Sequence, residues 1–132
     1  MRRTIGFPML GLSLLLAGPP GAAQEWRQAR DYDVLLTSFE IQPQEIRLRA
    51  GEPVRLRFVN NSEQRHSFSA PGFFAAAEMR GRDRRTLRGG AIVAPPLSET
   101  EIVLVPRKGR WWARGDNLFR RVLGMKARIV VE

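Results

Sequence analysis

The stretch EIRLRAGEPVRLRFVN, from Glu45 to Asn60, decides the fold of this chain. In Glu45–Ala50 and again in Pro53–Asn60, every second side chain is apolar and most of the side chains between are arginines. A period of two is typical of β-strands that bury one face and expose the other to water. Between the two runs, Gly51-Glu52-Pro53 is a turn signal. The stretch therefore predicts two adjacent strands joined by a tight turn.

The same pattern extends outward in both directions. We expect further strands over these ranges: Tyr32–Phe39, His66–Ala70, Glu99–Val105, Gly109–Arg114 and Lys126–Val131. Alanines and phenylalanines in Gly72–Met79 favour one short helix there. Short strands at this spacing predict an all-β fold, a Greek-key β-sandwich with seven or eight strands, over residues 24–132. Because neighbouring strand residues point to opposite faces, one of Trp111 and Trp112 should face the core and the other should be at least half exposed.

The first 23 residues have the composition of a targeting segment. Arg2 and Arg3 precede the apolar run Ile5–Ala17, which has the length of a signal-peptide core and is too short to span a membrane. Gly21 and Ala23 are the small residues expected before a cleavage site after Ala23. The alternatives are a buried N-terminal helix and, for the export route, a twin-arginine signal in place of general secretion. We expect a periplasmic or secreted protein with no membrane span after cleavage.

Composition excludes several classes of site. The chain carries 22 Lys and Arg against 13 Asp and Glu, for a formal net charge of +9, and it has no cysteine. Disulfides, cysteine-ligated zinc, iron–sulfur clusters and thiolate-bound copper are therefore excluded. With His66 as the single histidine and no paired-carboxylate or phosphate-binding motif, we expect a protein that is not an enzyme.

Four segments, in this order and spacing, resemble the cupredoxins, the plastocyanin- and azurin-like copper proteins. They are FEIQPQEI followed by AGEPV (39–46 and 50–54), FVNN followed by HSF (58–61 and 66–68), GRW (109–111) and GMKARIVVE (124–132). The resemblance covers nearly all of residues 32–132 and implies a cupredoxin fold. In that family two histidines and a cysteine bind copper, with a weak axial methionine.

Carried over residue by residue, the resemblance matches only half of that ligand set. His66 and Met125 stand at ligand positions, whereas Gly115 stands at the cysteine position and Arg120, or Asn117, stands at that of the second histidine. No cofactor is therefore expected, and any copper would bind with low affinity. His66 is either a remnant ligand or a hydrogen-bonded polar residue at the sandwich end. Met125 is either a soft Cu(I) ligand or a core residue, and Met79 is a candidate third donor.

A basic stretch follows the predicted helix and is expected to form an exposed loop. It contains five arginines: Arg80, Arg82, Arg84, Arg85 and Arg88. Together with an exposed Trp112, these side chains could dock on an acidic protein or an anionic surface. The alternative is a solvated charged loop without a partner. Nucleic acid is not expected as a partner, because the protein is predicted to be exported and its aromatics show no stacking pattern.

Two hypotheses for function remain. The first is an exported cupredoxin-like domain with a degenerate copper site, which acts as a non-catalytic, monomeric binding module. The second is a periplasmic copper-binding protein, either a weak Cu(I) carrier or an electron-transfer protein of the plastocyanin and azurin type. Copper uptake by the wild type and by His66→Ala separates them.

Overall fold

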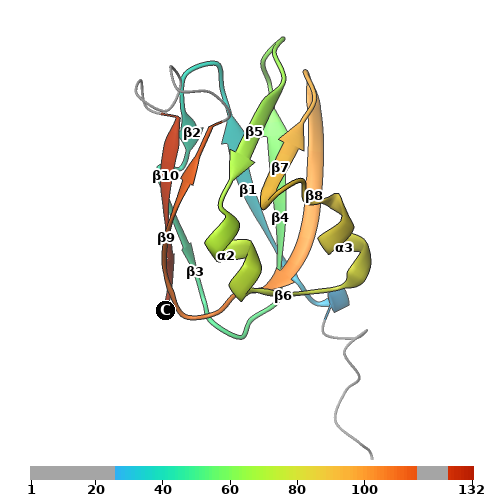
Figure 1. The fold of residues 1–132 in the computed structure, drawn as a ribbon, viewed down its shortest axis with the longest axis vertical. Helices are drawn as coiled ribbons and strands as arrows, with labels where there is room; N and C mark the ends of the chain where they lie inside the picture. Colours follow the sequence, from blue (N-terminus) through green and yellow to red (C-terminus); the bar gives the residue numbers. More distant parts are fainter. Residues whose placement is uncertain (1–25, 116–124) are drawn as a thin grey trace, which may run out of the picture.

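The computed structural model describes residues 26–115 and 125–132, and it shows two five-stranded sheets packed face to face (Figure 1). We call them the β4 sheet, in the order β2-β1-β4-β8-β6, and the β10 sheet, in the order β3-β10-β9-β5-β7. The elements follow one another along the chain as β1 (Arg30–Leu36), β2 (Ile41–Gln42), β3 (Glu45–Leu48), β4 (Val54–Asn60), β5 (His66–Ser69), α2 (Pro71–Ala76), β6 (Glu78–Met79), α3 (Gly81–Thr86), β7 (Ala91–Ala94), β8 (Ser98–Val105), β9 (Gly109–Arg114) and β10 (Lys126–Val131). The predicted leader and its cleavage site lie outside the described residues.

Alternation in the sequence places each strand in its sheet. Along β4, Val54, Leu56 and Phe58 are buried, while Arg55 and Arg57 point outward. β4 lies parallel to β1, with Leu36 opposite Asn60, and antiparallel to β8, with Asn60 opposite Ser98. In the β10 sheet, β10 lies parallel to β3 and antiparallel to β9. The predicted all-β sandwich is confirmed.

Aromatic rings fill the space between the sheets and α2. Phe58 of β4 meets Phe68 of β5 with ring centroids 4.9 Å apart. Phe73 and Phe74 of α2 are both buried, and Phe73 also meets the ring of Trp111 at 5.6 Å. Offset and edge-to-face contacts of this kind stabilise a core by roughly 0.5–1.5 kcal/mol each beyond burial. These contacts hold α2 against β9 of the β10 sheet.

The structure corrects three details of the prediction. Among the described residues there are ten strands rather than seven or eight, because β2 and β6 have only two residues each and the four residues of β7 are all apolar, so that none of the three shows an alternation of apolar and polar residues. Within the described part of the chain a second short helix, α3, follows α2, and it lies within the basic stretch that was expected to be a loop. Met79 belongs to strand β6, not to the predicted helix. No helix among the described residues is long and apolar enough to cross a membrane.

A buried carboxylate explains why the basic stretch folds into α3. Asp83 is buried, and its side chain accepts hydrogen bonds from the Val103 backbone N–H (3.1 Å) and from Arg80 Nε (2.6 Å). A buried carboxylate with both a backbone donor and a cationic partner has lost little by leaving water. Asp83 thereby attaches α3 to β8.

Candidate functional site

Three regions carry the residues singled out in the sequence: the end of the sandwich near His66, the outer face around Trp112, and α3. At the sandwich end, β4 ends and β5 and β10 begin (Figure 1). The Asn60 side-chain amide donates to the backbone oxygens of Gln64 (2.8 Å) and Ala94 (3.0 Å). Asn60 is itself buried. It therefore ties the loop before His66 to the end of β7.

His66 is fully buried and lies within this hydrogen-bonded network. Its Nε2 is 2.8 Å from Ser62 Oγ, and Ser62 Oγ is 2.9 Å from Asn60 Oδ1. The Ser62 backbone N–H also donates to Asn60 Oδ1, at 3.0 Å. One imidazole nitrogen thus has a side-chain partner from the loop that precedes β5.

Gly115 and Met125 lie next to each other, in close contact. The Gly115 N–H donates to the Met125 backbone oxygen at 2.7 Å. A Cβ atom added at Gly115 would lie 2.8 Å from Met125 Cβ, a distance at which one of the two residues must shift. Met125 is fully buried. The space that a cysteine side chain would enter at position 115 is therefore filled by Met125.

The donor atoms expected to converge on one point are divided between the two ends of the sandwich. Met79 pairs with Leu104 of β8, and Leu104 pairs with Val54, at the opposite end of β4 from Asn60. Met79 is therefore remote from the His66 network.

Arg120 and Asn117 lie outside the described residues. Within residues 26–115 and 125–132, no group of three or more His, Asp or Glu side chains could hold a metal ion. The cysteine-free donor set does not fit a blue-copper centre, which requires a thiolate.

The two tryptophans of β9 take the two environments expected of them. Trp111 packs against the core, and Trp112 is 51% exposed on the outer face of the β10 sheet. The Arg128 guanidinium lies 5.3 Å from the Trp112 ring centroid and the Lys126 ammonium lies 5.9 Å from it. Both distances are within the range of cation–π attraction. Trp112 therefore has two basic neighbours, and neither is an arginine of the 80–88 stretch.

Positive charge accumulates around Trp112. We call the Trp112 face the outward side chains Arg110, Trp112 and Arg114 of β9 with Lys126 and Arg128 of β10. Arg114 lies directly opposite Lys126 in the strand register. Among the described residues, no carboxylate is within ion-pair distance of Arg110, Arg114 or Lys126. Like charges directly opposite on neighbouring strands destabilise a sheet.

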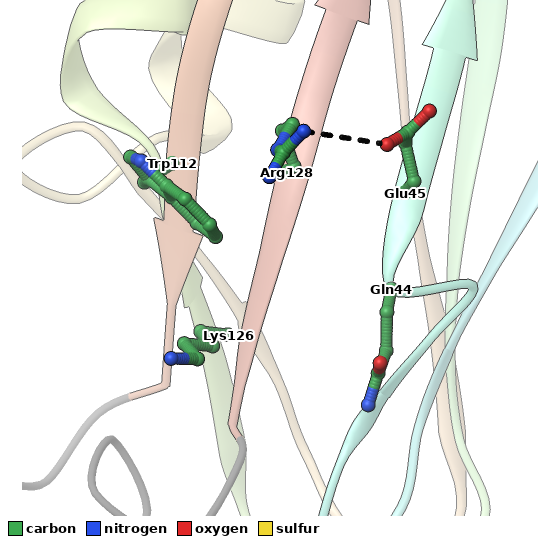
Figure 2. Close-up of a pocket in the computed structure, with 5 residues that line it drawn as sticks. All are labelled: Gln44, Glu45, Trp112, Lys126 and Arg128. Carbon is green, nitrogen blue, oxygen red and sulfur yellow. Dashed lines mark ion pairs between the residues drawn. The ribbon is translucent and has the colours of Figure 1, made fainter.

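A pocket of about 330 Å³ opens at this face (Figure 2). Its lining residues are Gln44, Glu45, Trp112, Lys126 and Arg128. Glu45 is shared, because Arg47 holds its Oε1 at 2.6 Å and the Arg128 guanidinium lies 3.8 Å from its Oε2. Arg128 is thus only loosely paired. The sequence already carried a signal for this site in the alternation of Arg, Trp and Arg along β9 and of Lys and Arg along β10.

In the basic stretch, the structure separates arginines with contacts inside the fold from arginines that face solvent. Arg80 pairs with Asp83 and lies over the Trp26 ring, and Arg84 donates to the Ala77 backbone oxygen at 3.1 Å. Arg82, Arg85 and Arg88 are exposed, although Arg82 Nε also lies 4.0 Å from Asp83 Oδ2. α3 lies against β8, on the far side of the molecule from β9 and β10 (Figure 1). The predicted partner-binding residues therefore form two separate basic surfaces, α3 and the Trp112 face.

Comparison with solved structures shows the fold. The chain is similar to a dithionite-reduced auracyanin from the photosynthetic bacterium Roseiflexus castenholzii, with 12% identity, 79% of this chain and 98% of that chain covered, and a TM-score of 0.57. It is similar to auracyanin A, a "blue" copper protein from Chloroflexus aurantiacus, with 16% identity, 77% and 99% coverage, and a TM-score of 0.51. It is also similar to part of a multi-copper oxidase from Pseudomonas thermotolerans, with 16% identity, 79% and 29% coverage, and a TM-score of 0.57.

No family model and no curated protein matches the sequence. At these identities the likeness concerns the fold alone. The chain has a cupredoxin-like fold, it has no cysteine, and its described part has no metal-ligand cluster.

Proposed function

We propose that this protein is an exported, non-catalytic binding domain that docks on an acidic partner protein through the Trp112 face. The observation that carries the proposal is an exposed tryptophan among cations, three of which have no carboxylate partner in the described part of the chain. Tryptophan and arginine are the residues that most often dominate binding energy at protein interfaces. An acidic partner would neutralise the repulsion between Arg114 and Lys126.

The end of the sandwich supports a structural rather than a redox role in this proposal. Met125 occupies the space beside Gly115, and His66 is held by Ser62. Without a thiolate, the charge-transfer and electron-transfer chemistry of a blue-copper centre has no ligand to support it. What remains at this end is a hydrogen-bonded network that joins the loop between β4 and β5 to the end of β7.

Binding to a polyanion tests the docking role. Purified protein is titrated with labelled polyglutamate at low and at high NaCl concentration, and fluorescence anisotropy is measured. We expect binding at low salt that weakens steeply as salt rises, because exposed charges separated by more than about 3 Å are screened at 1 M.

Replacing both Arg114 and Lys126 by Gln should weaken binding by about tenfold or more. The matched control replaces Arg82 and Arg85 by Gln, which removes the same charge from α3. No binding by the wild type at low salt would refute the proposal.

Copper uptake tests the competing function. Cu(I) and Cu(II) are added separately to the wild type and to His66→Ala, and bound metal is measured after gel filtration. We expect no stoichiometric uptake at micromolar metal. One equivalent of copper bound by the wild type and lost in the variant would replace our proposal with copper handling.

A further inference from the structure

We infer that the pocket beside Trp112 receives the acidic side chains of an extended polypeptide segment whose carboxylates stand at alternate positions. This inference rests on the proposed function, and it specifies the form of the ligand. It concerns the pocket lined by Gln44, Glu45, Trp112, Lys126 and Arg128.

The spacing of the cations matches an extended chain. Arg110, Trp112 and Arg114 are alternate residues of β9, and Lys126 and Arg128 are alternate residues of β10. Alternate side chains on one face of a strand repeat every 6.6 Å or so, and neighbouring strands lie about 4.8 Å apart. An extended peptide presents its own alternate side chains at the same repeat. A segment with acidic residues at every second position would therefore place one carboxylate near each successive row of cations.

The pocket itself fits a carboxylate. Two cations lie over the Trp112 ring, so a carboxylate that enters between them meets both charges while its methylene groups contact the indole (Figure 2). Lys126 has no carboxylate within ion-pair distance among the described residues. Arg128 is 3.8 Å from a Glu45 carboxylate that Arg47 already holds more closely. Neither cation has to give up a strong ion pair to bind the ligand.

The neighbouring edge of the sheet is less available to a peptide. β3 is an edge strand of the β10 sheet, and an open edge commonly binds an added strand. Here β3 is only four residues long, so its open edge offers few backbone groups to an added strand. We therefore place the segment across the outer face of β9 and β10 rather than along β3.

Two peptides of identical length and composition test the inference. In one, Glu and Thr alternate; in the other, all Glu residues precede all Thr residues. Each is labelled at its N-terminus and titrated with the full mature chain at low salt. We expect the alternating peptide to bind about fivefold more tightly or better. Trp112→Ala and Arg128→Gln should each abolish this preference, whereas Arg85→Gln on α3 should leave it unchanged. Unfolding curves confirm that each variant is folded.

The outcomes separate this inference from the proposed function. Equal affinity for the two peptides, or a preference that survives both Trp112→Ala and Arg128→Gln, would overturn the inference. If polyglutamate binding still depends on Arg114 and Lys126 in that case, the docking role stands without the pocket. If no acidic polymer binds, both fail. Tighter, Trp112-dependent binding of polygalacturonate than of either peptide, at equal carboxylate concentration, would assign the pocket to an acidic polysaccharide and refute the peptide.

Discussion

On the outer face of the β4 sheet, Arg55 and Arg57 each lie between two carboxylates, whereas on the Trp112 face Arg114 lies directly opposite Lys126. Asp31 of β1 is 2.7 Å from Arg55, and the other three contacts range from 3.5 to 3.9 Å. Both faces use the same strand geometry and are built largely from charged residues. The first neutralises these charges within the sheet, and the second leaves Arg114 and Lys126 without a carboxylate partner among the described residues.

This difference teaches which arginines to examine for function. A count of basic residues does not distinguish Arg55 from Arg114, because both are arginines on the outward face of a strand. The carboxylates on neighbouring strands do distinguish them. A cation whose cross-strand neighbours are acidic contributes to the sheet, while a cation opposite another cation must be explained by something outside it.

The largest expected effect is on binding. Arg128→Glu on the Trp112 face should weaken the affinity for polyglutamate by about tenfold or more at low salt. Arg55→Glu changes the net charge equally but on the other face, and we expect it to weaken affinity by about twofold at most. Fluorescence anisotropy measures both. An equal loss in the two variants would mean that net charge alone drives binding.

For the free energy of unfolding we expect the opposite ranking of the two faces. A substitution on the β4 sheet should cost more stability than one on the Trp112 face. Arg57→Ala leaves Asp33 and Glu99 without their cation, and we expect it to lower the free energy of unfolding by about 0.5–1 kcal/mol. Lys126→Ala removes a like-charge contact with Arg114, but it also removes a contact with the Trp112 ring, so the net change should be within about 0.5 kcal/mol. Urea denaturation measures both. A larger cost for the Lys126 variant would contradict the comparison.

Salt should remove much of the stability difference that charge causes. At about 1 M NaCl the screening length falls to roughly 3 Å, close to the separations within these ion pairs. The cost of Arg57→Ala should therefore be smaller at high salt than at low salt. The same urea titrations, repeated at both salt concentrations, provide the measurement. A cost independent of salt would assign the role of Arg57 to packing of its methylene groups.

The smallest expected effect concerns Tyr32, where β1 of one sheet meets β3 of the other. Burial raises the pKa of Tyr32 above its ordinary value of 10.0, and a hydrogen bond with the Arg47 backbone opposes the rise. The folded state therefore retains the phenolic proton more strongly than the unfolded state. This contribution is fully present below pH 10 and is lost as pH rises through the higher folded pKa.

Tyr32→Phe isolates that contribution. Between pH 9 and pH 11 the wild type should lose more stability than the variant, since Tyr32 is the only tyrosine in the chain. Lysines titrate in both proteins and cancel in the comparison. Urea midpoints at the two pH values provide the measurement, and identical pH dependence in the two proteins would show that Tyr32 is not perturbed.

Much of the fold was predictable because the strands are amphipathic. Gly109–Arg114 and Lys126–Val131 have the predicted bounds, and β4 differs from its prediction by one residue. The short strands β2, β6 and β7 were not predictable, because none of them shows an alternation of apolar and polar residues. α3 was missed because it has no apolar stripe, and a single buried aspartate holds it in place. The sequence feature that could have indicated this helix is Asp83, the one acidic residue among the arginines of this stretch.

The candidate site was predictable only in part. The exposure of Trp112 followed from strand alternation, but its neighbours depended on the pairing of β9 with β10. Without that register, Trp112 was grouped with the arginines of α3, on the other side of the molecule. The crowding between Gly115 and Met125 could not be read from the sequence, because it depends on how closely the two strand ends approach.

That close approach also bears on how such a domain can change over evolutionary time. The hydrogen bond from the Gly115 N–H to the Met125 oxygen joins the two ends of the described chain on either side of residues 116–124, and it involves backbone atoms only. Closing a longer loop costs little, about 0.6 kcal/mol for each doubling of its length, so a backbone closure of this kind tolerates connections of different length. A scaffold built this way can lose one chemistry and acquire another by changes in the sequence of a single connection.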